Sequence, residues 1–187
     1  LASTLSFSAI KNNDKVGLTL FSDRIEKYIP PNKGKSHALR VMREMIYHEA
    51  KDRKTDISFA LDHIQKVLKR KSIIFLISDF MDDSFFKSMK LLNKKHDLIN
   101  IQILDKSELK LPDLGLIKIH DAENKHSSWI DTGNYKNRVN ITELMLNKKD
   151  HIDTFCKRNK IDIIHINTQD GYVESLVHFF NSRLHRL

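Results

Sequence analysis

Residues Ser72–Asp79 have the sequence SIIFLISD, and this stretch decides the fold class. Its centre, Ile73–Ile77, is apolar at every position, so it predicts a strand that is covered on both faces. Such a strand lies in the middle of a parallel sheet with helices on each side. Directly before it, Ile57–Leu68 has the apolar spacing of an amphipathic helix. The two segments together indicate an α/β fold.

Helix and strand patterns alternate on both sides of this centre, which predicts a doubly wound, mostly parallel sheet with helices on both faces. A two-residue turn joins the first two strands, so we expect those two to be antiparallel. The other expected strands are Val16–Phe21, Arg24–Ile29 (ended by Pro30 and Pro31), Leu98–Leu104, Gly115–His120, Ser127–Asp131 (a hairpin around Asp121–Lys125) and Ile161–Ile166. Five further helices are expected. The first has Leu1, Leu5 and Ala9 on one face, and the second, Lys35–Glu49, has Leu39, Met42 and Ile46 facing inward. The third runs from Asp79–Asp83 to Lys95, the fourth, Asn137–Asn159, has a break near Lys148 and Lys149, and the closing helix has Val173, Leu176, Val177, Phe180 and Leu184 facing inward.

Length and composition limit the class of protein. The chain has 187 residues, 40% of them hydrophobic, which fits one domain over residues 1–187 with a sizeable core. Cys156 is the single cysteine, which excludes an internal disulfide and a cysteine-based zinc site. The longest apolar run is far shorter than the roughly 20 residues of a membrane helix. We therefore expect a cytoplasmic domain without a membrane segment, whose natural start lies upstream of Leu1.

The net charge of +8 leaves two interpretations open. Basic residues close two predicted helices, at Lys66–Lys71 and at Lys157–Lys160. Cations at these positions complement the helix dipole without any ligand, which is the simpler interpretation. A functional basic face is the alternative.

Several motifs of enzymes are absent. Gly34–Ser36 resembles the end of a phosphate-binding loop, but position 29 is Ile where that motif needs Gly. No serine-hydrolase elbow and no zinc-binding histidine pair occurs in the sequence. Cys156 and His165 lie within predicted helix and strand segments, where we expect them to be structural.

Polar side chains are expected to meet at the carboxyl edge of the sheet, where open α/β sheets bind ligands. Ser78 and Asp79 end the apolar strand, Thr55 and Asp56 begin the helix before it, and Asp105 ends the next strand. Hydroxyl and carboxylate oxygens are ligands for Mg²⁺. A simpler role as helix caps is the alternative, for Thr55 or Asp56 at one helix and for Asp82 or Asp83 at the next.

At these residues the chain resembles von Willebrand factor type A domains. More closely, it resembles a bacterial family with such a domain, with no assigned activity, commonly encoded beside MoxR-type AAA+ ATPases. The resemblance covers nearly the whole chain and is carried by Asn12–Leu18, Leu20–Asp23, Ile29–Pro31, Lys54–Asp56, Ile77–Phe80, Leu104 and Asp105 with Glu108, Leu111 and Pro112, Ile130–Thr132, and Phe179 and Phe180.

The resemblance implies a metal-ion-dependent adhesion site that is incomplete here. Type A domains bind a divalent metal through a D-x-S-x-S loop, a Thr in a second loop and an Asp in a third. Thr55 and Asp79 match the second and third loops, with Asp56 and Ser78 nearby. The D-x-S-x-S loop precedes the first helix of such domains, and Leu1 already lies in that helix. We therefore expect Mg²⁺ to bind the longer parent protein, and to bind this chain weakly or not at all.

Two functions from different classes follow. The first is a non-catalytic protein-interaction module, and the resemblance suggests a MoxR-type AAA+ ATPase as its partner. The alternative is a Mg²⁺-dependent enzyme that acts on nucleic acid through Asp79, Asp105 and Asp56. No stripe of basic and aromatic residues supports nucleic-acid binding, so we expect neither nucleic acid as a partner nor catalysis.

The resemblance also bears on assembly. In type A domains the first strand lies between the strands expected at Val16–Phe21 and Ser72–Ser78. Without it, either these two strands pair directly, or a strand of a second copy fills the gap and forms a homodimer. We expect the second outcome.

Overall fold

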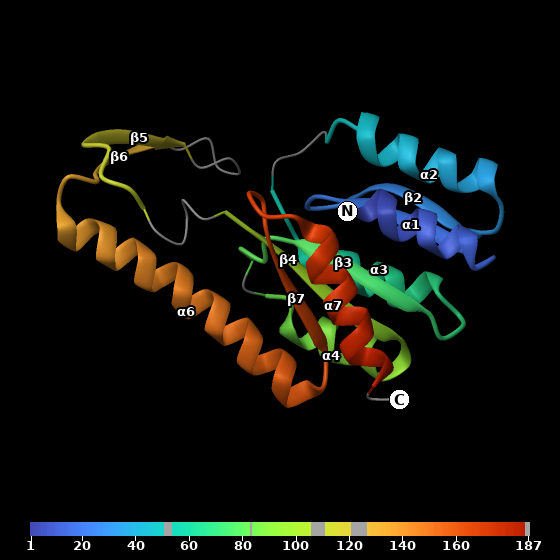
Figure 1. Ribbon diagram of the computed structural model, residues 1–187. Coiled ribbons are helices and arrows are strands. Elements are labelled where there is room, and N and C mark those ends of the chain that lie inside the picture. The colour runs from blue at the N-terminus through green and yellow to red at the C-terminus, as the bar shows by residue number, and fades with distance from the viewer. Residues whose placement is uncertain (51–53, 83, 106–110, 121–126, 186–187) are drawn as a thin grey trace.

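The computed structural model describes residues 1–50, 54–82, 84–105, 111–120 and 127–185. Its centre is a three-stranded parallel sheet with the strand order β3–β4–β7 (Figure 1). β3 comprises Ile73–Ser78, β4 Asp97–Leu104 and β7 Asp162–Asn167. Because the three strands are parallel, their carboxyl ends share one edge of the sheet and their amino ends share the other.

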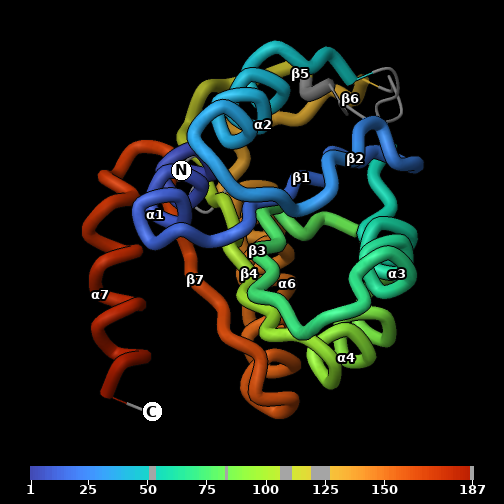
Figure 2. The backbone as a smooth tube through the Cα atoms, turned by 90° about the vertical axis from the view of Figure 1, so that its right-hand side faces the viewer, coloured from blue at the N-terminus to red at the C-terminus, as the bar shows by residue number. Residues whose placement is uncertain are grey.

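Helices cover both faces of this sheet, as the alternating pattern predicted (Figure 2). On one face lie α3 (Ile57–Val67), α4 (Phe86–Lys95) and the second half of α6 (Tyr135–Asn159). On the other face lie α1 (Ala2–Lys11) and α7 (Tyr172–Leu184). The first face buries Leu61, Leu76, Met89, Leu92, Leu98 and Ile152, and the second buries Ile99, Ile101, Ile164, Ile166, Leu176 and Phe179.

The stretch that predicted the fold occupies a different place from the one expected. Among the described strands, β3 pairs only with β4 and lies at the edge of the parallel sheet, whereas β4 is in the middle and is the most buried strand. The apolar pattern of β3 still has its expected cause, since Phe75 packs in the core of one face and Leu76 in the core of the other. An apolar pattern on both faces of a strand indicates that helices cover both faces, but it does not indicate how many strands pair with that strand.

A second, two-stranded sheet stands beside the first. β1 (Val16–Phe21) pairs antiparallel with β2 (Ile25–Asn32), and α2 (Lys35–Tyr47) packs on the pair. The prediction that Pro30 and Pro31 end the strand was wrong: β2 runs through both. Proline is tolerated there because, among the described strands, β2 is paired on one side only, with β1. On the unpaired side a residue without an amide N–H gives up no hydrogen bond to a neighbouring strand.

The inward faces of two helices also differ from the prediction. In α2, Ala38 and Val41 are buried, while Leu39 and Ile46 are exposed. In α7, Leu176 is buried as predicted, but Phe179 is the second buried residue, and four predicted inward residues are exposed: Val173, Val177, Phe180 and Leu184. Both helices carry apolar side chains on more than one face, so spacing alone allowed two choices, and contact with the sheet decides between them.

The remaining elements form an arm that extends from the body (Figure 1). It consists of the hairpin β5 (Leu116–His120) and β6 (Ser127–Asp131), and the first half of α6. The predicted turn at Asp121–Lys125 lies outside the described residues. α6 is continuous, and the break predicted near Lys148 and Lys149 is absent. Within the described ranges, no helix combines the length and apolar character needed to cross a membrane.

Candidate functional site at the carboxyl edge of the sheet

The chain leaves β3 through a tight turn that fixes Asp79. The amide of Met81 donates to Asp79 Oδ1 at 3.3 Å, and so does the Ser78 hydroxyl at 3.3 Å. The amide of Phe80 in turn donates to Ser78 Oγ at 3.1 Å. Asp79 is exposed, and its Oδ2 accepts no hydrogen bond from a described residue. The turn therefore presents one carboxylate oxygen to a ligand in a fixed orientation.

Phe80 holds this turn in an unusual backbone conformation. Its φ angle is +59°, in the left-handed region that bulky side chains rarely adopt. The side chain is buried and packs edge-on against Phe85, with ring centroids 5.5 Å apart. Burial of the ring offsets the backbone strain. Backbone strain of this kind persists only where the surrounding structure holds it in place, and it is frequent at binding sites.

The first turn of α3 uses two carboxylates as caps. The amide of Phe59 donates to Asp56 Oδ1 at 2.8 Å, which makes Asp56 the N-cap residue. The amide of Ile57 donates to Asp82 Oδ2 at 2.9 Å. The capping interpretation is thus confirmed for Asp56. For Asp82 the helix is not the predicted one, because Asp82 caps α3. The N-cap residue of α4 is Phe85, which makes no side-chain cap hydrogen bond, and Asp83 lies outside the described residues.

Thr55 lies just before this capped turn and makes no hydrogen bond to a described residue. Asp105, the third predicted acidic position, accepts a hydrogen bond from Thr168 Oγ1 at 2.9 Å, which ties the end of β4 to the end of β7. Asp105 is therefore engaged in the sheet edge itself. Glu108 of the resemblance lies outside the described residues.

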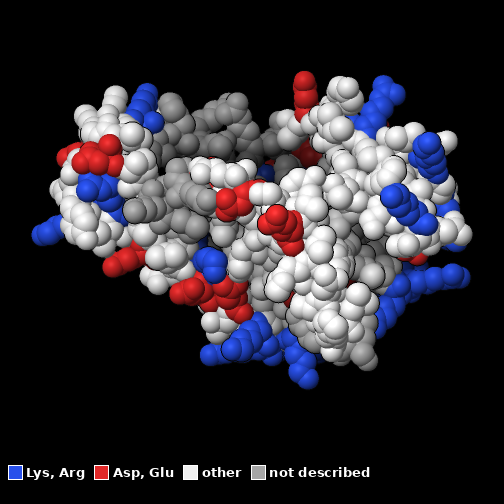
Figure 3. Space-filling view, in the orientation of Figure 1, with Lys and Arg blue, Asp and Glu red and all other residues white. Residues whose placement is uncertain are grey.

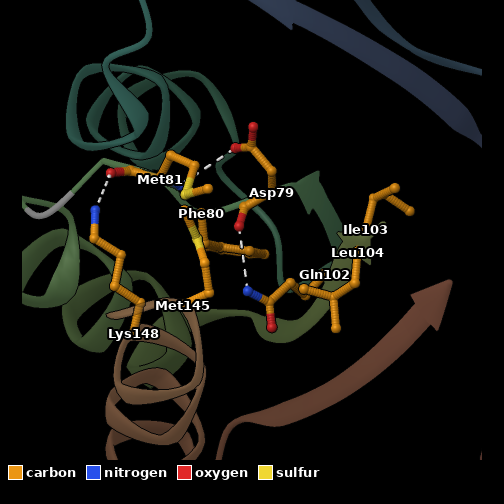
Figure 4. Close-up of a pocket in the computed structure, with 8 residues that line it drawn as sticks. All are labelled: Asp79, Phe80, Met81, Gln102, Ile103, Leu104, Met145 and Lys148. Atoms are coloured by element: carbon orange, nitrogen blue, oxygen red, sulfur yellow. Dashed lines mark hydrogen bonds between the residues drawn. The ribbon is translucent and has the colours of Figure 1, made fainter. Parts of the chain in front are cut away.

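A small cavity of about 20 Å³, large enough for one water molecule, lies on the inner side of the Asp79 turn (Figure 4). Gln102 of β4 donates from Nε2 to the Asp79 carbonyl at 3.2 Å, and its buried Oε1 has no described partner. Lys148 of α6 donates to the Met81 carbonyl at 3.2 Å. Figure 4 shows the Asp79 carboxylate pointing away from Gln102, so the cavity and the carboxylate lie on opposite sides of the turn.

The side chains present are suitable ligands for Mg²⁺ in type but insufficient in number. Thr55 Oγ1 and Asp79 Oδ2 accept no hydrogen bond from a described residue, and Asp56, which caps α3 through Oδ1, has only its Oδ2 left for a ligand. In the described part of the chain, no three His, Cys, Asp or Glu side chains come together as a metal site. Mg²⁺ requires near-octahedral oxygen coordination, so these ligands would have to be completed by water or by other donors.

Sequence reasoning identified Asp79 but missed the residues that hold its turn. Gln102 carried a signal, because an amide in the middle of an apolar strand needs a partner. Lys148 carried none, since its contact joins residues far apart in the sequence. The left-handed Phe80 also had no signal, because that conformation is typical of Gly or Asn.

The sequence comparisons point to a family. The family described as "Protein of unknown function DUF58" matches residues 1–151. The uncharacterized protein Rv1480 of Mycobacterium tuberculosis is 24% identical over 126 residues, which cover 65% of this chain and 39% of that protein. The uncharacterized protein MAV169 of Mycobacterium avium is 28% identical over 69 residues, covering 36% of this chain and 41% of that protein. The chain thus spans well under half the length of these relatives, and no solved structure matches it.

Proposed function

The chain belongs to the DUF58 family, and we propose that it is a non-catalytic protein-interaction module that binds its partner at the carboxyl edge of the sheet. The observation that carries this proposal is the turn at Ser78–Met81. It holds an exposed carboxylate at a strand end through two hydrogen bonds and a strained Phe80. A fixed, exposed carboxylate binds an amine, a guanidinium or a metal ion without further rearrangement.

The apolar surface beside this turn supports a protein as the partner. Met81 and Met145 line the small cavity together, and Met145 belongs to the half of α6 that extends into the arm. Next to it, Leu144 is 62% exposed, and several further apolar side chains of the arm are also exposed: Leu114, Leu116, Trp129, Tyr135 and Leu146. Exposed apolar side chains that gather on one part of a molecule are typical of protein-binding surfaces.

A metal ion and an ATPase complete the proposal: the ion comes from the resemblance to type A domains, and the ATPase from the resemblance to the bacterial family with such a domain. Thr55 and Asp79 would be ligands of Mg²⁺, and the ion would supply positive charge for a carboxylate of the partner. A MoxR-type AAA+ ATPase is the partner that the resemblance suggests. Asp79 orients the ion or the partner's cation, and the arm supplies the apolar contact.

The alternative function, a Mg²⁺-dependent enzyme that acts on nucleic acid, has less support. The basic residues that close α3, α4 and α6 lie at the amino edge of the sheet, opposite Asp79 and Asp105. A strand of six residues spans about 20 Å. A nucleic acid bound to those cations would therefore lie far from the carboxylates. Mg²⁺-dependent cleavage of a labelled oligonucleotide would favour this alternative over the interaction module.

Binding of a MoxR-type ATPase from the same genome tests the proposal. We expect Asp79→Ala to weaken the binding at least tenfold, roughly the value of one charge-assisted hydrogen bond. Asp79→Asn should weaken it similarly, because it keeps the shape but loses the charge. Asp14→Ala is the matched control, since Asp14 is also an exposed aspartate but lies between α1 and β1. Unchanged affinity of a folded Asp79→Ala protein would contradict the proposal, as would an equal loss in the control.

A further inference from the structure

A group of exposed basic residues lies at the amino edge of the parallel sheet. Each strand there follows a helix that ends in cations, so three helix ends meet beside three strand beginnings. Hydrogen bonds join these ends. Lys95 donates to the Leu68 carbonyl at 2.9 Å, and the Asn93 amide donates to the Asn159 carbonyl at 3.4 Å. We call this surface the basic rim; its exposed cations are Lys66, Lys69, Arg70, Lys71, Lys94, Lys95, Lys157, Arg158 and Lys160.

The carboxylates at this edge do not neutralise the rim. Asp97 and Asp162 begin β4 and β7, and both are paired with Arg183 of α7. The hydrogen bond to Asp97 raises the pKa of Arg183, so this pairing persists at any physiological pH. Apart from Lys95, none of the rim cations forms an ion pair or hydrogen bond with a described residue. Figure 3 shows Lys and Arg side chains along the lower margin of the molecule, where α4 and the end of α6 lie.

We propose that the basic rim binds the surface of an anionic lipid bilayer. Cations from three neighbouring helix ends form a broad surface rather than a pocket, which suits a layer of headgroups better than a single ligand. Most are lysines, which act as hydrated point charges and do not need the two-pronged geometry of a specific phosphate site. Clusters of four to eight such cations are the usual signature of attraction to anionic lipids.

Exposed apolar side chains within the rim favour a bilayer over nucleic acid. Ile73, the first residue of β3, is 63% exposed beside Lys71, and Leu184 is 70% exposed beside Arg183. Leu91, one turn before Lys94 and Lys95, is exposed as well. Apolar side chains among cations enter the boundary between headgroups and acyl chains, whereas a nucleic-acid backbone offers them nothing. The cations lie among no aromatic side chains that would stack on bases.

Vesicle co-sedimentation tests this proposal. We expect the protein to bind vesicles of 70% phosphatidylcholine and 30% phosphatidylglycerol, and to bind pure phosphatidylcholine vesicles far more weakly. Each cation near an anionic surface contributes about fivefold to partitioning. The triple change Lys69→Ala, Arg70→Ala and Lys71→Ala should therefore reduce binding about 100-fold. A second variant with Lys94→Ala and Lys157→Ala, from the other two helix ends, should reduce it about 25-fold.

A matched triple change controls for net charge. Lys15, Lys33 and Lys35 are exposed lysines around β1, β2 and α2, and their replacement by Ala removes the same charge elsewhere. This variant should keep most of the vesicle binding. An equal loss in both triple variants, equal binding to neutral vesicles, or binding to a 20-base-pair duplex without binding to anionic vesicles would each overturn the proposal.

Discussion

Two polar residues of the parallel sheet form hydrogen bonds to neighbouring helices. Asn100, in the middle of β4, is fully buried and donates to Met89 Sδ and to Cys156 Sγ, both at 3.3 Å. His165 of β7 is bonded to Asp153 of α6 at 2.8 Å, which confirms its predicted structural role. These contacts join the sheet to α4 and α6. The same residues are therefore unavailable for chemistry at the surface.

Cys156 should be unreactive in the native state. It is 0% exposed, and burial raises the pKa of its thiol to about 11. At pH 8 only about one thiol in a thousand is then ionised, and the thiolate is the reactive form. We expect Ellman's reagent to leave the folded protein unmodified and to modify one thiol per chain after unfolding in guanidinium. Rapid modification without denaturant would contradict this placement.

His96 should make the protein sensitive to acid. Its ring is buried at the end of α4, and neither ring nitrogen has a described partner. Burial, together with the charge of Lys95, lowers the pKa of His96. The unfolded chain therefore takes up a proton below its ordinary pKa of about 6.5, while the native chain stays neutral until its own lower pKa is reached. Stability consequently falls as the pH decreases through this window.

Urea unfolding at pH 7.5 and pH 5.5 measures the contribution of His96. We expect His96→Leu to lose less stability between the two pH values than the unchanged protein does. His178→Leu serves as the control, because His178 is exposed on α7 and should leave the pH dependence unchanged. The same loss of stability in all three proteins would show that His96 titrates normally.

Among the elements, α3 connects the core to the candidate site. Its inner face, at Ile57, Ala60 and Leu61, was predicted from spacing and is buried as expected. Its first turn was less predictable, because only one of its two caps is local. Asp56 is part of the sequence signal for a helix start, whereas Asp82 reaches the Ile57 amide from 25 residues away.

A change at Asp56 separates the capping role from a role in metal binding. We expect Asp56→Ala to lower the free energy of unfolding by about 1 kcal/mol, the usual cost of a lost N-cap. Asp56→Ser should restore most of this stability, because serine is an equally good cap. Urea denaturation of the two variants measures the difference. If Ser were as destabilising as Ala, the carboxylate itself would be required, and the capping role would not explain it.

At the scale of the whole molecule, the sequence predicted the kinds of element better than their neighbours. Apolar periodicity depends on which faces of a helix or strand are covered. It correctly predicted the strands before and after α4 in the sequence, and the helices on both faces of the sheet. It does not depend on hydrogen-bonded neighbours, so it placed β3 in the middle of the sheet when β4 is there. For the same reason Asp79 was found at a strand end, but the contacts of its turn with Gln102 and with Lys148 of α6 were not.

The open side of β3 leads to the last prediction, which concerns assembly. β1 and β3 are not paired with each other, so direct closure of the gap between them, one of the two expected outcomes, does not occur. Among the described residues, no strand pairs with the outer side of β3, and such an edge pairs readily with another chain. We expect the isolated chain to dimerise as its concentration rises, with a strand of a second copy at this edge. Light scattering over a concentration series measures it.

Substitutions at two equally exposed isoleucine and leucine positions locate the interface. Ile73→Lys places a charge on the open edge of β3, where Ile73 is 63% exposed, and charged side chains at an edge oppose strand pairing. It should shift the protein towards the monomer. Leu144→Lys introduces the same side chain on α6 at 62% exposure, away from any strand edge, and should leave the association unchanged. A monomer at every concentration, or a larger effect of Leu144→Lys, would show that the β3 edge does not pair.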